Sequence, residues 1–164
     1  MNKPTINLNH YIRQMGLADP TNLTKNILIV GAGSIGSWTA LALLKLGCSN
    51  VTVLDFDKVE EHNAGSQLYT SFDAGKTKLK AMEDRLMGLT ETKPIFIDLE
   101  LNSENAFDTL IGFDIVIAAT DNIESRTLIF NILKGIEQVG TAQDTLFLDA
   151  RMAGNAIEIY TIPM

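Results

Sequence analysis

The sequence is poor in cysteine, in aromatic residues and in positive charge, and each deficit excludes a class of structure or function. The single cysteine, Cys48, excludes an internal disulfide and a cysteine-rich zinc site within the chain, and it fits a reducing compartment. The net charge is −7 and the aromatic residues, 7% of the chain, do not interleave with a basic block, so we expect no binding to nucleic acid or to an anionic membrane. No apolar run approaches membrane-spanning length and the first residues lack a signal-peptide core, so we expect a cytoplasmic protein.

The 164 residues are enough for one domain with its own core, and 46% of them are hydrophobic. There is no internal repeat, no low-complexity tract and no linker. We therefore predict a single domain over residues 1–164. Residues 1–24 should form an N-terminal arm and a short helix, which we place at His10–Leu17.

The segment from Ile27 to Asp55 predicts a nucleotide site. An apolar run, Ile27–Val30, leads directly into glycines in G-x-G-x-x-G spacing, and a second apolar run ends at Asp55, 19 residues after the last glycine. Between them, apolar residues recur at helical spacing on what we expect to be the buried face of a helix that ends at Gly47: Ile35, Trp38, Thr39, Ala42, Leu43 and Leu46. Strand, glycine turn, helix, strand and acid follow in the order of a dinucleotide-type fingerprint. The alternative is a glycine-rich turn with packing duties only.

Each part of this fingerprint has a physical task. Gly31 and Gly33 allow a tight turn and a close approach to a phosphate, while Gly36 allows the helix to approach the strand. Free backbone N–H groups at the start of the helix, where Ser34 and Ile35 lie, face the anion together with the positive end of the helix dipole. Asp55 can accept hydrogen bonds from ribose hydroxyls.

Further strands and helices alternate along the chain. We predict helices at Phe72–Met87 and Ser103–Ile111 and a third that is capped by Asn122. Strands are expected at Pro94–Leu99, Asp114–Ala119, Thr145–Ala150 and Ala156–Ile162. The last two are too close for a helical crossover. We therefore predict an α/β fold: a doubly wound, mostly parallel Rossmann-like sheet with helices on both faces and a C-terminal antiparallel hairpin.

Several polar residues surround the same crevice. Ligands of a doubly wound sheet bind outside the carboxyl ends of the strands, and this places the glycine turn, Asp55 and Asp121 together. Arg13, Asn63, Gln67 and Lys78 lie in the segments that flank these ends. Two cations and one carboxylate beside a phosphate cradle suit a triphosphate with Mg²⁺. The alternatives are a solvated helix lysine at 78, a surface arginine at 13 and a simple helix-dipole charge at 121.

The chain resembles the family of ThiF, MoeB and the ubiquitin-activating enzymes over nearly its whole length. The motifs that carry the resemblance keep the family's order and spacing: R-Q-M-G-L (13–17), I-L-I-V-G-A-G-S-I-G (27–36), V-T-V-L-D-F-D-K-V-E-E-H-N (51–63), A-G-K-T-K (74–78) and A-T-D-N-I-E-S-R (119–126). The resemblance implies ATP-dependent adenylation of a C-terminal carboxylate, on a ubiquitin-like or sulfur-carrier protein that ends in glycine, with release of pyrophosphate. It also implies a homodimer.

By the same resemblance, Arg13, Lys78 and Asp121 are the catalytic candidates. Arg13 would act on the neighbouring subunit's ATP, and Asp121 would bind Mg²⁺ while ATP is present. The residues expected to bind nucleotide are Gly31, Gly33, Ser34, Ile35, Gly36, Asp55, Asp57, Asn63, Gln67, Lys78, Asp121 and Asn122.

Two departures leave other functions open. The family usually has arginine where this chain has Ser66, and the region that carries zinc-binding cysteines and a catalytic cysteine in the family is absent from this sequence, which implies a fragment or a minimal member. One alternative is therefore a non-catalytic half of a heterodimeric activating enzyme that supplies a dimer surface. A second is an NAD-dependent oxidoreductase, which the fingerprint allows but which leaves the clustered charges without a task.

Overall fold

The computed structural model describes residues 7–138 and 144–164, so the first six residues of the predicted arm lie outside the described part. One six-stranded sheet has the order β3-β2-β1-β4-β5-β6. The strands are β1 (Ile27–Val30), β2 (Val51–Leu54), β3 (Ile95–Ile97), β4 (Ile115–Ala118), β5 (Leu146–Ala153) and β6 (Ala156–Pro163). The first five run parallel, and β6 pairs with β5 in antiparallel register. The predicted doubly wound sheet with a C-terminal hairpin is confirmed.

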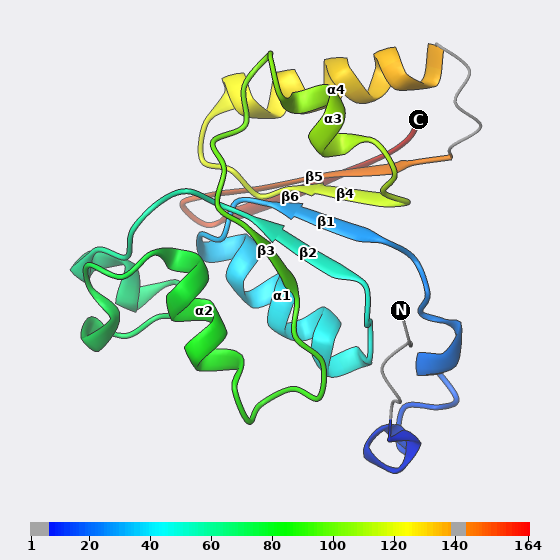
Figure 1. Cartoon of the computed structure of the whole chain (residues 1–164), viewed down its shortest axis with the longest axis vertical. Coiled ribbons are helices and arrows are strands. Elements are labelled where there is room, and N and C mark those ends of the chain that lie inside the picture. The colour runs from blue at the N-terminus through cyan, green and yellow to red at the C-terminus, as the bar shows by residue number, and fades with distance from the viewer. Residues whose placement is uncertain (1–6, 139–143) are drawn as a thin grey trace.

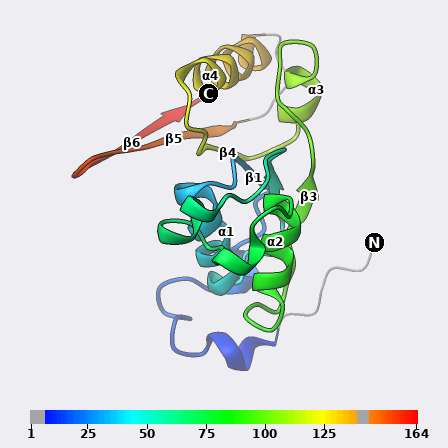
Figure 2. The ribbon, with the colours of Figure 1, turned by 90° about the vertical axis from the view of Figure 1, so that its left-hand side faces the viewer.

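Helices cover both faces of the sheet (Figure 1). They are α1 (Ser34–Leu46), α2 (Lys78–Leu86), α3 (Ala106–Leu110) and α4 (Ile123–Gln138). One apolar cluster lies between the sheet and the first two helices, and a second lies between the sheet and the last two. Figure 2 shows the β5–β6 hairpin reaching beyond the other strands at one end of the sheet. None of the helices among the described residues is long and apolar enough to cross a membrane.

Strands β1 and β2 are buried along their whole length, as expected for the centre of a parallel sheet. Because the strand order reverses between β1 and β4, the chain leaves these neighbouring strands in opposite directions and opens a crevice at their carboxyl ends. The fold therefore provides a ligand site where the glycine turn follows β1.

The predicted buried face of α1 is wrong in part: Ile35 and Leu43 pack, partly buried, against the core, but Trp38, Ala42 and Leu46 are exposed. The residues that are buried are Gly36, Ser37, Ala40 and Leu44, while the Trp38 side chain, expected in the core, is 49% exposed. Small residues face the sheet because α1 lies close to it, and a bulky indole has no room there. The Trp38 indole instead donates a hydrogen bond to the Ser66 carbonyl oxygen at 2.9 Å, which ties α1 to the loop after β2.

Three other predicted helices are shorter than expected. Instead of a helix at Phe72–Met87, a 3₁₀ turn at Ser71–Asp73 precedes α2, which begins at Lys78 with Thr77 as its side-chain cap. The N-terminal segment forms only a 3₁₀ turn, Leu8–Tyr11, followed by turns up to Leu17. The helix predicted at Ser103–Ile111 is confined to Ala106–Leu110. Side-chain hydrogen bonds to backbone amides, from Thr77 and Asn102, accompany the late starts of α2 and α3, and periodicity does not detect them.

Gly36 is where α1 comes closest to β1. A Cβ atom at this position would overlap the carbonyl oxygen of Gly31 and approach the Ile29 side chain at 3.2 Å. Gly31 itself has a φ of +100°, and a Cβ there would lie 2.7 Å from the Ala119 carbonyl oxygen. The contact between the two glycines therefore sets the position of the helix start relative to β1 and β4.

We expect Gly36→Ala to lower the free energy of unfolding by at least about 2 kcal/mol, because two backbones must separate to admit the methyl group. Gly135→Ala is the matched control: this glycine lies inside α4 with nothing within 4 Å of the added carbon. It should stabilise the protein by roughly 0.5–1 kcal/mol. Urea unfolding of both variants measures the difference, and equal stabilities would contradict the close approach.

Candidate functional site

A cavity of about 620 Å³ lies over the carboxyl ends of β1, β2 and β4. Most of the predicted nucleotide-binding residues line it: Gly31, Gly33, Ser34, Ile35, Asp55, Asp57, Gln67, Lys78, Asp121 and Asn122. A smaller, more polar cavity of about 270 Å³ adjoins it and shares Asp57, Gln67, Lys78 and Asp121. Asn63 lines only this smaller cavity. The sequence therefore identified residues that the fold brings together from five separate segments.

The start of α1 forms the floor of the main cavity. No side chain caps this end of the helix, so its first N–H groups lack the usual side-chain acceptor. A Cβ at Gly33 would meet nothing within 4 Å, which leaves open space directly above the turn. Gly36 does not line the cavity and serves only the close packing described above. This floor can hold an anion.

Asp55 lies at the end of β2 with its carboxylate almost wholly buried. It accepts backbone hydrogen bonds from Ala32, at 2.7 Å, and from Asp57, at 2.8 Å. Burial raises the pKa of Asp55 above its ordinary value, and these hydrogen bonds and the nearby Lys78 charge oppose the rise. The Asp55 carboxylate thus holds the glycine turn in place and still faces the cavity.

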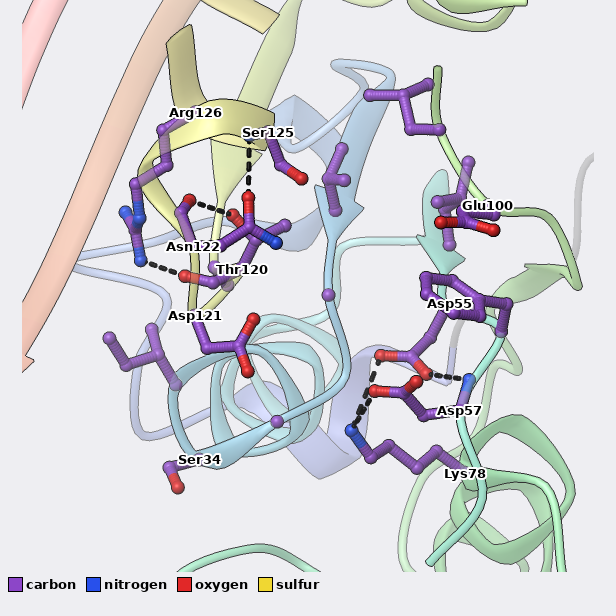
Figure 3. Close-up of a pocket in the computed structure, with 18 of the residues that line it drawn as sticks. Ser34, Asp55, Asp57, Lys78, Glu100, Thr120, Asp121, Asn122, Ser125 and Arg126 are labelled. Carbon is purple, nitrogen blue, oxygen red and sulfur yellow. Dashed lines mark hydrogen bonds and ion pairs between the residues drawn. The ribbon is translucent and has the colours of Figure 1, made fainter. Parts of the chain in front are cut away.

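Lys78, the first residue of α2, points into the cavity beside the two aspartates (Figure 3). Its Nζ lies 2.7 Å from Asp57 Oδ2 and 4.0 Å from Asp55 Oδ2, and only 11% of the side chain is exposed. Its backbone N–H also donates to the Asp57 carbonyl oxygen at 2.8 Å. The cation is therefore oriented by the loop after β2, which is unlike a solvated helix lysine.

Asp121 lies on the other side of the glycine turn, in the loop that follows β4 (Figure 3). Its side chain is exposed to both cavities. Asn122 accepts the Ser125 N–H at 2.7 Å and so caps α4, as predicted. Asp121 is therefore not needed as the cap and is available to a ligand. Among the described residues, no three His, Cys, Asp or Glu side chains form a group that could hold a metal ion.

Arg13 does not reach the cavity of its own chain. It is exposed, and the neighbouring Gln14 donates to the Leu46 carbonyl oxygen at 2.6 Å, at the far end of α1. The cavity lies at the opposite end of this 13-residue helix, roughly 20 Å away at 1.5 Å per residue. Arg13 is therefore not part of the cavity of its own chain.

Two arginines that sequence reasoning did not assign also line the main cavity, Arg126 from α4 and Arg151 from β5. Arg126 lies one helical turn after the Asn122 cap. This spacing in the sequence could have indicated that the Arg126 side chain lies beside the Asp121 loop. Arg151 carries no such local signal, because its position depends on the hairpin.

The match to known proteins agrees with this geometry. A profile of the ThiF family matches residues 10–141. The chain belongs to the ThiF family. Among its relatives, the adenylyltransferase and sulfurtransferase MOCS3 of Aedes aegypti is 34% identical over 121 residues, which are 72% of this chain and 28% of that protein. The sulfur carrier protein adenylyltransferase of Thermus thermophilus is 34% identical over 110 residues, 63% of this chain and 39% of that protein. The chain thus spans well under half the length of these relatives.

ThiF-like folds are also found among solved structures. The tRNA N6-threonylcarbamoyladenosine dehydratase TcdA of E. coli, solved in complex with ATP, superposes with a TM-score of 0.78 at 22% identity. The match covers 92% of this chain and 62% of TcdA. E. coli MccB, solved with a MccA peptide derivative, has a TM-score of 0.74 at 20% identity, over 94% of this chain and 47% of MccB. At these identities the likeness establishes the fold.

Ser66 distinguishes this ThiF-family chain from the motif it resembles. Its hydroxyl lies 3.0 Å from the Ser34 hydroxyl, at the start of α1, and Ser66 is not among the residues that line either cavity. Ser66 therefore places a neutral hydroxyl beside the helix start.

The loop before Lys78 is held by a buried carboxylate, Asp73. It is fully buried and forms ion pairs with Lys76, at 3.1 Å, and with Arg85, at 2.6 Å. Burial alone would raise the pKa of Asp73, but hydrogen bonds from Thr70, Lys76 and Arg85 hold it at about 2. This cluster fixes the segment that places Lys78 at the start of α2.

Asp73 should make the protein acid-sensitive. Because its folded pKa is about 2, below the ordinary 3.8, its contribution to the free energy of unfolding is complete above about pH 5 and is lost as the pH falls through 3.8 toward 2. The shift corresponds to about 2 kcal/mol. We expect Asp73→Asn to lose this stability at pH 6 and to show a flatter decline in unfolding free energy between pH 4 and pH 2.5. Asp98→Asn, at an exposed position, is the control, and a parallel decline in both variants would contradict the role.

Proposed function

We propose that this chain is an ATP-dependent adenylyltransferase. Its substrate would be the C-terminal carboxylate of a ubiquitin-like or sulfur-carrier protein that ends in glycine. The observation that carries the proposal is the convergence of Asp55, Lys78 and Asp121 on one cavity above the uncapped start of α1, in a member of the ThiF family. The relatives named as adenylyltransferases support the reaction class.

The cavity fits a nucleoside triphosphate in shape and hydrogen bonding. Gly33 leaves open space over the helix start, where a phosphate can accept backbone N–H groups. Asp55 keeps acceptor capacity beyond its two backbone contacts, which suits ribose hydroxyls. The Oε1 atom of Gln67 is buried without a hydrogen-bond partner among the described residues and would take a donor from the ligand.

The charges of the cavity favour a triphosphate that arrives with a divalent cation. Four acidic side chains and three basic ones line the main cavity, and Ser66 supplies no further cation. A strongly negative ligand therefore needs a counterion of its own. Mg²⁺ binds one or two carboxylates together with phosphate oxygens, so Asp121 would hold it and the metal would neutralise charge on the phosphates. Lys78 would neutralise the phosphates from the opposite side.

The reaction then requires no protein nucleophile. An oxygen of the substrate carboxylate attacks the α-phosphorus of ATP and forms the acyl–phosphate bond. The bond from the α-phosphorus to the bridging oxygen breaks, and pyrophosphate leaves with that electron pair. No proton needs to move, so the protein contributes orientation and charge stabilisation. Lys78, released from Asp57 as phosphate enters, would stabilise the developing charge on the leaving group.

The proposal extends to a cytoplasmic location, for which the single buried Cys48 is the support.

Asp121→Asn tests the proposed reaction. The variant keeps the Asn122 cap, so it should melt like the parent and yet lose ATP–pyrophosphate exchange by well over about tenfold, more than 1.4 kcal/mol of transition-state stabilisation. The assay uses a panel of Gly-Gly-ended carrier proteins. Glu124→Gln, an exposed acid in the first turn of α4 that lines neither cavity, is the matched control and should exchange normally.

Three other outcomes would count against the proposal or a part of it. Exchange by Asp121→Asn at the parent's rate would refute its role in catalysis. ATP binding without exchange in the parent would favour the non-catalytic half of a heterodimer, which the serine at position 66 makes plausible on charge grounds. Equal or greater thermal stabilisation by NAD than by Mg²⁺–ATP would contradict adenylation, since a ligand at 100 times its Kd adds about 2.7 kcal/mol.

We further propose a homodimer in which Arg13 of one chain completes the site of the other, because Arg13 lies at the far end of α1 from its own cavity. Arg13→Ala and Lys78→Ala should each be inactive alone. Mixed together, they should recover up to about a quarter of the parental exchange rate, because half of the dimers then carry one intact site.

The control for this mixing experiment is Lys78→Ala with Asp121→Ala, two residues that line the same cavity. If Lys78 and Asp121 act at the same site of one chain, mixing these two variants should restore no exchange activity. Recovery that occurs only when Arg13→Ala is mixed with Lys78→Ala would indicate that Arg13 acts in trans. Failure of the Arg13 pair to recover in a confirmed mixed dimer would reject the trans role.

A further inference from the structure

Arg126, at the edge of the cavity, donates hydrogen bonds to four groups. It is in the first turn of α4 and is 8% exposed. Its guanidinium donates to the carbonyl oxygens of Ala118, at 3.3 Å, and Ala150, at 2.9 Å, and also to that of Thr120. It forms an ion pair with Asp149 as well. One side chain thus joins β4, the loop after it, and β5.

The carbonyl groups that Arg126 binds belong to the segment that carries Asp121. Ala118 is the last residue of β4, and the Thr120 carbonyl is part of the peptide bond to Asp121. Ala118 still pairs with Val30 and Asp149 in the sheet, whereas Thr120 lies beyond the last paired residue of β4, where a backbone carbonyl needs solvent or another donor. Figure 3 shows the Arg126 side chain beside this loop, joined to Thr120, with the Asp121 carboxylate directed into the cavity.

Asp149 holds the guanidinium in place from the opposite side. This carboxylate is 4% exposed and also accepts from Arg151, through Nε at 2.9 Å and Nη2 at 2.5 Å. Arg151 in turn lies over the Tyr160 ring, 5.1 Å from its centroid. When Arg126 is replaced, Asp149 keeps its ion pair with Arg151. The variant therefore loses the hydrogen bonds to the loop without leaving a buried charge unpaired.

The other contacts of the loop do not replace this grip. The Asn122 cap fixes the start of α4, and the Thr120 hydroxyl lies 3.4 Å from the Asn122 carbonyl oxygen, a long hydrogen bond. Neither contact reaches the carbonyl groups at the end of β4, and the Ala119 N–H, which donates to the Val30 carbonyl oxygen at 2.8 Å, ties the loop to β1 and not to β5. We propose that Arg126 is a positioning residue: it clamps the Ala118–Thr120 backbone to β5 and so holds Asp121 at the cavity. The catalytic part of this inference rests on the proposed function.

The first experiment does not depend on ATP. Amide hydrogen exchange is measured in the parent, in Arg126→Gln and in Arg126→Lys, with attention to the amides of Ala119, bonded to the Val30 carbonyl, and Ser125, bonded to Asn122. We expect these amides to exchange at least about tenfold faster in Arg126→Gln. The lysine variant should lie between it and the parent, because one ammonium group cannot reach carbonyls on three segments.

Arg151→Gln is the matched control, since it removes the other guanidinium on Asp149 but contacts none of the loop carbonyls. In Arg151→Gln, the amides of Ala119 and Ser125 should exchange as in the parent. Unchanged exchange in a folded Arg126→Gln overturns the positioning role, whatever the protein does with ATP. If Arg126→Gln does not fold, the same comparison of amide exchange is made with Arg126→Lys, and unchanged exchange in that variant overturns the positioning role.

The second experiment tests whether Arg126 affects ligand binding through Asp121. Binding of Mg²⁺–ATP is measured for Arg126→Gln, Asp121→Asn and the double variant. If Arg126 acts through Asp121, each single variant should bind Mg²⁺–ATP at least about tenfold more weakly than the parent. The double variant should bind no more weakly than Asp121→Asn. Excess Mg²⁺ should partly restore the affinity of Arg126→Gln for ATP. Losses that multiply, or no rescue by Mg²⁺, overturn the proposal that Arg126 works through this residue. A parent that binds no ATP refutes the proposed function and leaves the exchange result to decide on the clamp.

Discussion

The contact between the start of α1 and the end of β1 governs the rest of the site. Gly36 lies against the Gly31 carbonyl, and Gly31 lies against the Ala119 backbone, so three backbone segments meet without a side chain between them. This close approach brings the uncapped end of the helix to the point where β1 and β4 diverge. Asp55 then holds the same turn from β2 through the Ala32 N–H, while the Tyr69 hydroxyl binds the Ala32 carbonyl at 2.7 Å. The anion site is thus held by backbone packing on both sides.

The site separates two tasks between its two sides. On the β2 side, Asp55 and Lys78 are largely buried, and the exposed Asp57 is joined to them by an ion pair with Lys78 and by its backbone N–H bond to Asp55. On the β4 side, Asp121 is exposed and depends on the loop that carries it. A rigid charged side suits recognition of a ligand's fixed parts, and a side held by a loop suits a carboxylate that binds a metal only while the nucleotide is present.

Much of this architecture could be predicted from the sequence because it is local. Continuous apolar runs identified the parallel strands, the short connection identified the β5–β6 hairpin, and Asn122 was identified as a cap. The predicted buried face of α1 was wrong in part, because hydrophobicity suggested Trp38, whereas packing distance selected Gly36 and Ala40. The start of α2 was wrong because Asp73 binds the Thr70 amide and holds a 3₁₀ turn. Arg126 could not be placed because its partner Asp149 lies on β5, 23 residues along the chain, and Arg151 could not be placed because the position of β5 and β6 beside the cavity depends on the folded sheet.

The clamp on the Asp121 loop also has a consequence for the order in which the site is completed during synthesis. The glycine turn and Asp55 are present once the ribosome has made residue 55, but Asp149 and Ala150 come from β5, the penultimate strand of the sheet. At translation rates of roughly 5 to 20 residues per second, the interval between the two is of the order of ten seconds. The Asp121 loop of a nascent chain therefore cannot be bound to β5 through Arg126 until the last two strands have been made and have folded onto the sheet.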